Sequence, residues 1–83
     1  PAAVPRSPAA VAAAHVTDDR LERTVDELTA EAQAPTPDAI RTRLVADLAR
    51  EQYAGLRGTA GHLTATQAFQ STVAGRVQRY LGN

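Results

Sequence analysis

The sequence predicts an all-α fold: a small three-helix bundle in which two helices form an αα-hairpin and a third helix follows a glycine-rich joint. Three segments carry apolar residues at intervals of three and four, which is the period of an amphipathic helix. No stretch alternates apolar and polar residues long enough to predict a strand. The chain has 83 residues, 43% of them hydrophobic, and no cysteine, so it can form one small domain held together by packing alone.

An Ala/Pro-rich linker is predicted over residues 1–16. Pro1, Pro5 and Pro8 fall within this stretch, and closely spaced prolines are typical of an extended tether. The Ala-Val run over 9–14 is shorter than the roughly 7 to 15 apolar residues at the centre of a secretory signal. We therefore expect a tether that leaves an upstream domain, followed by a helical interaction domain over residues 17–83.

The first helix is expected over residues 18–34. Thr17 can cap its N-terminus, and Asp18 and Asp19 complement the helix dipole in the first turn. Proline cannot continue a helix, so Pro35 marks the end. The predicted apolar stripe has a spacing of 4, 3 and 4 and consists of Leu21, Val25, Leu28 and Ala32.

The second helix is expected over residues 37–54, and its start signal is the strongest in the chain. Thr36 is a good N-cap, Pro37 stands at the first helical position where its missing N–H costs nothing, and Asp38 follows. The two-residue joint at 35–36 predicts that the first two helices form an antiparallel hairpin. The predicted buried face consists of Ile40, Leu44, Val45, Leu48, Ala49 and Tyr53.

The third helix is expected over residues 65–81. Thr64 and Gln67 have the spacing of a capping box. The ten residues before it, 55–64, include three glycines and are expected to let the third helix move independently of the hairpin. Its apolar stripe is Phe69, Val73, Val77, Tyr80 and Leu81.

The predicted core is thin, which favours self-association. Only three large apolar residues lie on the first helix, and a second chain that buries more apolar surface would stabilise it. We expect a homodimer formed by the first two helices. The residues expected to form the core or the dimer interface are Leu21, Val25, Leu28, Ile40, Leu44 and Leu48.

Charge is distributed unevenly although the net charge is zero. Residues 1–51 hold six arginines and nine acids, while residues 52–83 hold three arginines and no acid. Two interpretations remain open: the acidic first helix pairs with the basic third helix, or Arg57, Arg76 and Arg79 dock on an acidic protein partner. In the second case the docking residues are Phe69, Val73, Arg76, Val77, Arg79, Tyr80 and Leu81.

The sequence does not contain the spacing of histidines, serines and acids that is typical of catalytic or metal sites. His15 and His62 are 47 residues apart, and Ser7 and Ser71 have no histidine or acid at helical spacing to activate them. The glycines between 55 and 61 could bind an anion, but we interpret them as a hinge. We therefore expect no catalytic, cofactor or metal site and no enzymatic activity. No apolar run approaches the roughly 18 residues of a membrane span, so we expect no membrane partner and a cytoplasmic location.

Two resemblances support different functions. The tether, the run Asp19-Arg20-Leu21-Glu22 and the helical stretch 39–50 are similar to the C-terminal docking region of actinobacterial modular polyketide synthases. That resemblance implies a dimerising helix pair after a carrier-domain linker and a last helix that engages the next polypeptide. It favours a non-catalytic module that dimerises and docks the end of a larger bacterial polypeptide.

The second resemblance covers residues 28–44, which are similar to the N-terminal helix-turn-helix of the KfrA-type plasmid DNA-binding family. It implies a helix-turn-helix-like DNA-binding domain in which Arg41 and Arg43 contact phosphates. The match ends after Leu44, where that family turns into its recognition helix and this chain continues as helix. Because the net charge is zero, we place DNA binding second.

Overall fold

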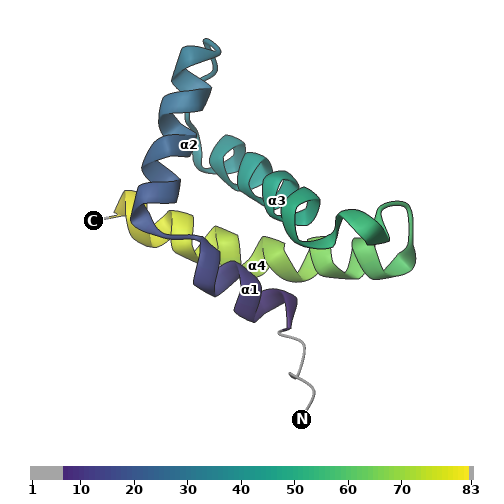
Figure 1. Cartoon of the computed structure of the whole chain (residues 1–83). Helices are drawn as coiled ribbons and strands as arrows, with labels where there is room; N and C mark the ends of the chain where they lie inside the picture. Colours follow the sequence, from purple (N-terminus) through teal and green to yellow (C-terminus); the bar gives the residue numbers. More distant parts are fainter. Residues whose placement is uncertain (1–6, 83) are drawn as a thin grey trace.

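The computed structural model describes residues 7–82, and this part of the chain is all-helical, as predicted. Figure 1 shows the arrangement: α4 forms the base, α1 and α3 pack against it, and α2 packs mainly on α3 and extends away from the base. No strand occurs between residues 7 and 82. The elements in chain order are α1 Pro8–His15, α2 Asp18–Ala30, α3 Pro37–Tyr53, the 3-10 helix η1 Ala54–Leu56 and α4 Ala60–Gly82.

Helix α1 corrects the expectation of an extended tether over the whole of 1–16. Residues 8–15 are helical, while residues 1–6 lie outside the described part. The Ser7 hydroxyl accepts a hydrogen bond from the Ala10 N–H at 3.2 Å, and Pro8 stands at the first helical position. Val11 packs into the core from α1, so this segment is part of the folded unit.

Helix α2 ends four residues earlier than predicted, before Pro35 is reached. Ala32 adopts a left-handed backbone with φ of 59°. Its N–H donates to the Thr29 carbonyl at 3.0 Å, and the Gln33 N–H donates to the Leu28 carbonyl at 2.9 Å. This pair of bonds is a Schellman motif, which closes the helix. Ala32 is therefore exposed in the turn and does not belong to the buried stripe.

Helix α4 begins earlier than predicted, at Ala60. Thr59 occupies the capping position, since its hydroxyl accepts from the His62 N–H at 3.2 Å. The predicted cap Thr64 lies inside the helix, where its hydroxyl donates to the Ala60 carbonyl at 2.9 Å. Only residues 57–59 separate η1 from α4, and Gly58, with φ of 82°, makes the turn. The expected ten-residue joint is therefore a short connection.

The principal helix pair is α3 with α4, not α2 with α3 as predicted. After the short connection, α4 returns alongside α3 (Figure 1). Phe69 is fully buried at the centre of this packing, and its ring lies 5.7 Å from that of Tyr53. The buried apolar cluster comprises Val11, Ala12, Val16, Leu21, Leu28, Ile40, Leu44, Val45, Leu48, Ala49, Phe69, Val73 and Val77.

Candidate interaction surface

The residues predicted for the core or the dimer interface lie mainly inside a single chain. Leu21, Ile40 and Leu44 have no exposed surface, and Leu28 and Leu48 are buried as well. Val25 alone of this set is partly exposed, although it packs against the core. The buried members complete the chain's own core and leave Val25 as the one apolar side chain of the set that can contact a partner.

The predicted docking stripe of the third helix divides in the same way. Phe69, Val73 and Val77 are buried within the chain, because α1 and α3 cover that side of α4. Tyr80 is half-buried against the core, and Leu81 is 44% exposed. The stripe is therefore used for folding over most of its length, and only its C-terminal end reaches the surface.

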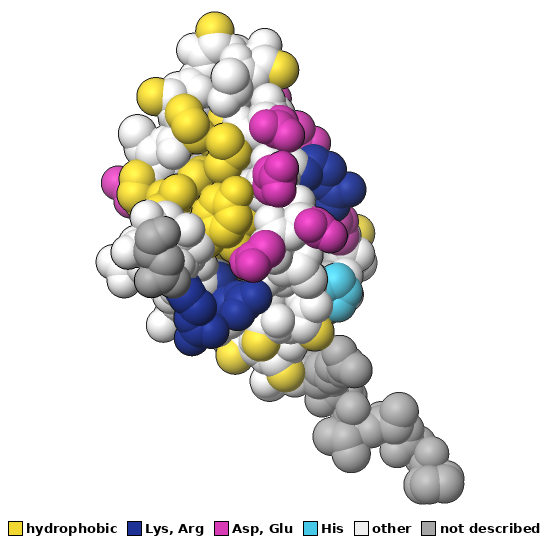
Figure 2. Space-filling view, turned by 90° about the vertical axis from the view of Figure 1, so that its left-hand side faces the viewer, with side chains coloured by type: hydrophobic (Ala, Val, Ile, Leu, Met, Phe, Trp, Pro, Cys, Tyr) yellow, Lys and Arg dark blue, Asp and Glu magenta, His cyan; other side chains and the backbone are white. Residues whose placement is uncertain are grey.

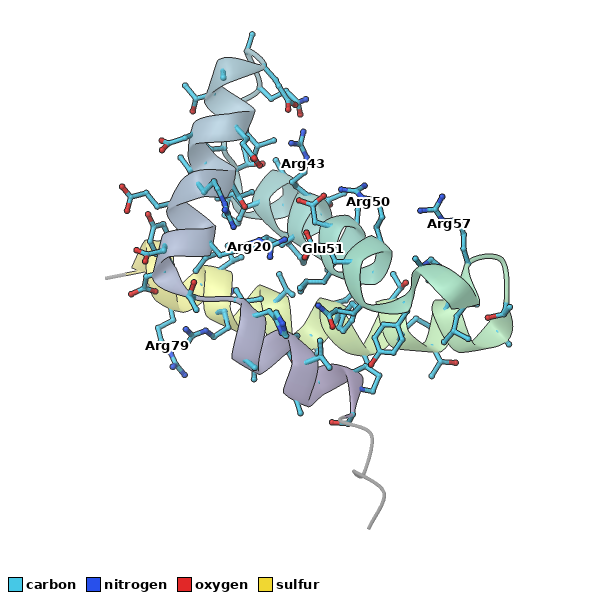
Figure 3. All side chains as sticks on the ribbon, viewed as in Figure 1. Arg20, Arg43, Arg50, Glu51, Arg57 and Arg79 are labelled. Carbon is cyan, nitrogen blue, oxygen red and sulfur yellow. The ribbon has the colours of Figure 1, made fainter. Side chains whose placement is uncertain are left out.

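Arg76 connects α4 to the junction between α1 and α2. Its Nε donates to the Val16 carbonyl oxygen at 3.1 Å, across 60 residues of sequence. That carbonyl belongs to the C-cap residue of α1, where helix carbonyls lack partners within the helix. Arg76 thus joins α4 to the end of α1. Arg79 lies at the exposed C-terminal end of α4 (Figure 3).

Apolar side chains from two helices meet on one face of the molecule, bordered by opposite charges (Figure 2). Arg76, Arg79 and Tyr80 line a hollow together with Asp18, so the arginines border the α4 side of this surface. The α2 acids border the other side, where a spacing of four places Asp18, Glu22 and Asp26 along one exposed line. We call this surface the α2–α4 face, and define it by Asp18, Glu22, Val25, Asp26, Arg76, Arg79, Tyr80 and Leu81.

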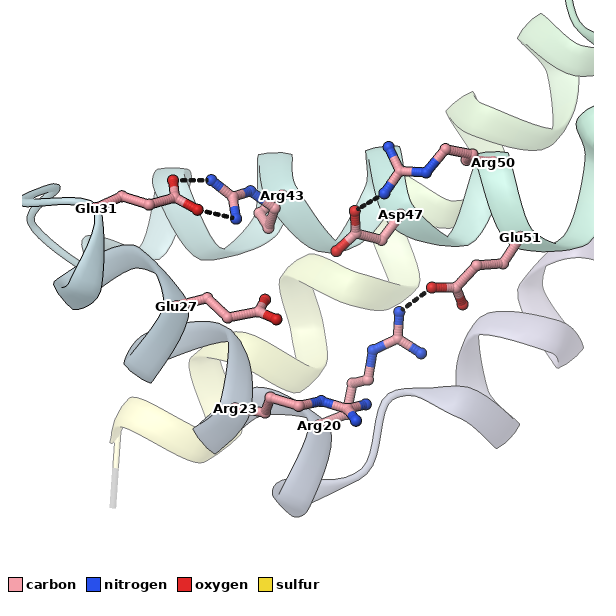
Figure 4. A pocket seen from close by; sticks show the side chains of 8 residues that line it. All are labelled: Arg20, Arg23, Glu27, Glu31, Arg43, Asp47, Arg50 and Glu51. Carbon is pink, nitrogen blue, oxygen red and sulfur yellow. Dashed lines mark hydrogen bonds and ion pairs between the residues drawn. The ribbon is translucent and has the colours of Figure 1, made fainter.

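A groove of about 450 Å³ lies between α2 and α3, and charged side chains line all of it (Figure 4). Three ion pairs cross or border it: Arg43 with Glu31 at 2.5 Å, Arg50 with Asp47 at 2.5 Å and Arg20 with Glu51 at 2.8 Å. The two further lining residues, Arg23 and Glu27, also balance in charge. The groove is therefore neutral overall and is bridged by its own side chains.

The Arg43–Glu31 pair has the best geometry of these contacts. The two terminal guanidinium nitrogens of Arg43 donate to the two carboxylate oxygens of Glu31, a bidentate arrangement that the planar guanidinium favours. These hydrogen bonds lower the pKa of the Glu31 carboxyl from its ordinary value of 4.5. The same bonds raise the pKa of Arg43. The pair fastens the C-terminal end of α2 to α3.

The two histidines considered for metal binding lie at helix ends. The His15 ring contacts its own helix, with Nδ1 2.8 Å from the Val11 carbonyl oxygen. The backbone N–H of His62 donates to the Thr59 hydroxyl at the start of α4. No group of three or more histidine and acidic side chains between residues 7 and 82 has the arrangement of a metal site. Gly61, which the sequence predicts to be part of a hinge, lies in the first turn of α4.

The two arginines that the DNA-binding interpretation needs make contacts within the chain. Arg41 donates to the Gln70 side-chain oxygen at 2.7 Å and lies 3.6 Å from the Asp38 carboxylate. Arg43 is held by Glu31. Phosphate binding by either side chain would have to replace these bonds.

Comparisons of the chain with protein-family models, curated proteins and solved structures find no match. Across residues 7–82, no helix has both the length and the apolar character that a bilayer span requires. We therefore infer the function from the surface of the chain. The sequence alone indicated the charges of the α2–α4 face through the uneven distribution of acids and arginines, but it did not indicate which apolar side chains stay exposed between them.

Proposed function

We infer that the chain is a non-catalytic protein–protein interaction module that binds its partner through the α2–α4 face. The observation that supports this function is the combination, on one face, of apolar side chains from two helices with acids along one side and arginines below the apolar side chains (Figure 2). An isolated exposed leucine is ordinary. An apolar centre with a charged rim is the usual anatomy of a protein interface, in which the rim charges select the partner.

The resemblance to polyketide synthase docking regions supports the same class of function. In that setting the chain would dimerise and dock the end of a larger bacterial polypeptide in the cytoplasm. The three-helix arrangement expected there needs one adjustment, because most of the last helix, α4, is buried against α1 and α3. Docking then falls to α2 and to the C-terminal end of α4, where Arg79 can meet an acidic group of the partner.

Site-specific photo-crosslinking in the cells that produce the chain tests this function. A benzophenone amino acid is placed at Glu22 or at Leu81, which are exposed on the α2–α4 face, and at Leu63, which is 59% exposed near the other end of α4. We expect positions 22 and 81 to form adducts with the same protein, identified by mass spectrometry, and position 63 to form none. Absence of adducts from 22 and 81, or equal yields from 63, would contradict the proposed function.

A further inference from the structure

We propose that the partner of the α2–α4 face is a second copy of this chain, bound about a two-fold axis that passes through the apolar centre of the face. This inference rests on the proposed function and adds the identity of the partner and the symmetry of the complex. A two-fold interface uses the same surface on both copies, so the surface must be complementary to itself. The α2–α4 face meets that condition in both its charge and its apolar residues.

The charges on the face are complementary under a two-fold rotation. Acids lie on the α2 side of the apolar centre and arginines on the α4 side. Rotation by half a turn about an axis that lies in the interface and runs between the two borders places the acids of one copy opposite the arginines of the other, twice. Because the chain has a net charge of zero, no overall repulsion opposes the approach of a second copy.

The acids that remain for a second copy can be named. Asp18 already lines the hollow that contains Arg76 and Arg79 of its own chain. Glu22 and Asp26 are exposed and form no ion pair with any residue of the described range 7–82. These two acids would lie opposite the arginine border of the other copy, which Arg76 and Arg79 form. A different protein would have to supply both signs of charge in the matching order, whereas a second copy supplies them by symmetry.

The apolar centre of the face has the packing of an incomplete core. Helix α2 packs mainly on α3 and little on α4, so the side of α2 nearest to the end of α4 is only partly covered. Val25 and Tyr80 pack against the core but keep some exposure, and Leu81 is 44% exposed. A second copy would cover these side chains with their own counterparts, and their burial would favour association.

Sedimentation of the purified chain over a range of concentrations gives the first test. We expect the mean mass to rise from 8.8 kDa toward twice that value as concentration increases. Leu81→Ser should raise the dimer dissociation constant about tenfold, because it removes apolar contact at the axis. The matched control is Leu63→Ser, which changes the same residue type near the other end of α4 and should leave the constant unchanged.

A charge-exchange pair gives the sharper test, because only a reciprocal interface predicts its outcome. One variant carries Glu22→Arg and Asp26→Arg, and the other carries Arg79→Glu. Each variant alone should dimerise about tenfold more weakly than the parent, since like charges then face one another. An equimolar mixture should recover association, because each border of one variant now faces its opposite on the other. Arg57→Glu, remote from the face (Figure 3), is the control and should behave as the parent.

Three results would overturn the inference: a parent that stays at monomer mass at every concentration, a mixture that associates no better than its components, or controls that weaken association as much as the face variants. Circular dichroism of each variant establishes that it is folded. If the parent is monomeric while position 81 still crosslinks to a different protein, the second copy is excluded as the partner and the interaction function stands. If the parent is monomeric and position 81 crosslinks to no protein, both the second copy and the interaction function are excluded.

Discussion

Ala32 is in a backbone conformation that suits glycine. Its φ of 59° places it in the left-handed region, where a Cβ atom costs roughly 1–2 kcal/mol. Glycine would remove that cost, but its greater conformational freedom in the unfolded chain offsets part of the gain in stability. We expect Ala32→Gly to raise the free energy of unfolding by about 0.5–1 kcal/mol in urea titrations. Ala46→Gly, at an exposed position within α3, should lower it by a similar amount. A loss of stability in both variants would contradict the Schellman turn.

The Glu31 carboxylate should make stability depend on pH in the acid range. Its pKa is lower in the folded chain than its ordinary 4.5 because Arg43 donates hydrogen bonds to it. A lowered pKa contributes stability that is fully present above 4.5 and is lost as pH falls through the folded pKa. We therefore expect Glu31→Gln to melt at a lower temperature than the parent at neutral pH, with a difference that closes as pH falls below 4.5. A constant difference would exclude the pair as its cause.

Arg76 and Arg79 should differ in their effect on stability, although the sequence predicts the same docking role for both. Arg76 donates to the Val16 carbonyl, and hydrogen bonds to charged groups contribute about 1.5–3 kcal/mol. We expect Arg76→Ala to lower the free energy of unfolding by an amount in that range. Arg79→Ala, at an exposed position, should change it by no more than about 0.5 kcal/mol. If urea titrations gave the same free energy of unfolding for both variants, the Arg76 hydrogen bond to Val16 would not stabilise the fold.

At the scale of the helices, capping signals in the sequence predicted starts better than ends. Thr36 caps α3 as expected, accepting from the Ala39 N–H at 3.1 Å. The pair Ser7-Pro8 repeats the pattern of Thr36-Pro37 and starts α1, but the alanine run that follows has no apolar periodicity to indicate a helix. The end of α2 depends on Ala32, a residue type that does not mark a left-handed turn in a sequence.

Packing between helices could not be predicted from the same patterns. The stripe on α4 was recognised from its spacing, but an apolar stripe fits its own bundle and a partner equally well. The structure places Phe69 and Val73 inside the chain because the short connection after α3 returns α4 alongside it and because α1 packs on α4 as well. For the same reason the apolar part of the candidate surface, at Val25 and Leu81, follows from the tertiary arrangement and not from periodicity.

For the whole molecule, stability should depend on the buried leucines and not on the exposed ones. Leu44 has no exposed surface, whereas Leu63 is 59% exposed. Truncation of a buried leucine removes apolar burial and leaves a cavity, so we expect Leu44→Ala to lower the free energy of unfolding by about 2–5 kcal/mol. Leu63→Ala should change it by no more than about 0.5 kcal/mol. Similar losses in thermal or urea unfolding would contradict the core described above.

The central claim is that the α2–α4 face is the surface through which this chain binds a second copy, and an NMR dilution series tests it most directly. Amide resonances are followed as the labelled chain is diluted. We expect concentration-dependent shifts at residues 18–26 and 76–82, which belong to the face, and none at residues 57–64, which are remote from it. Spectra that do not change with concentration, or shifts confined to the connection between α3 and α4, would contradict the claim.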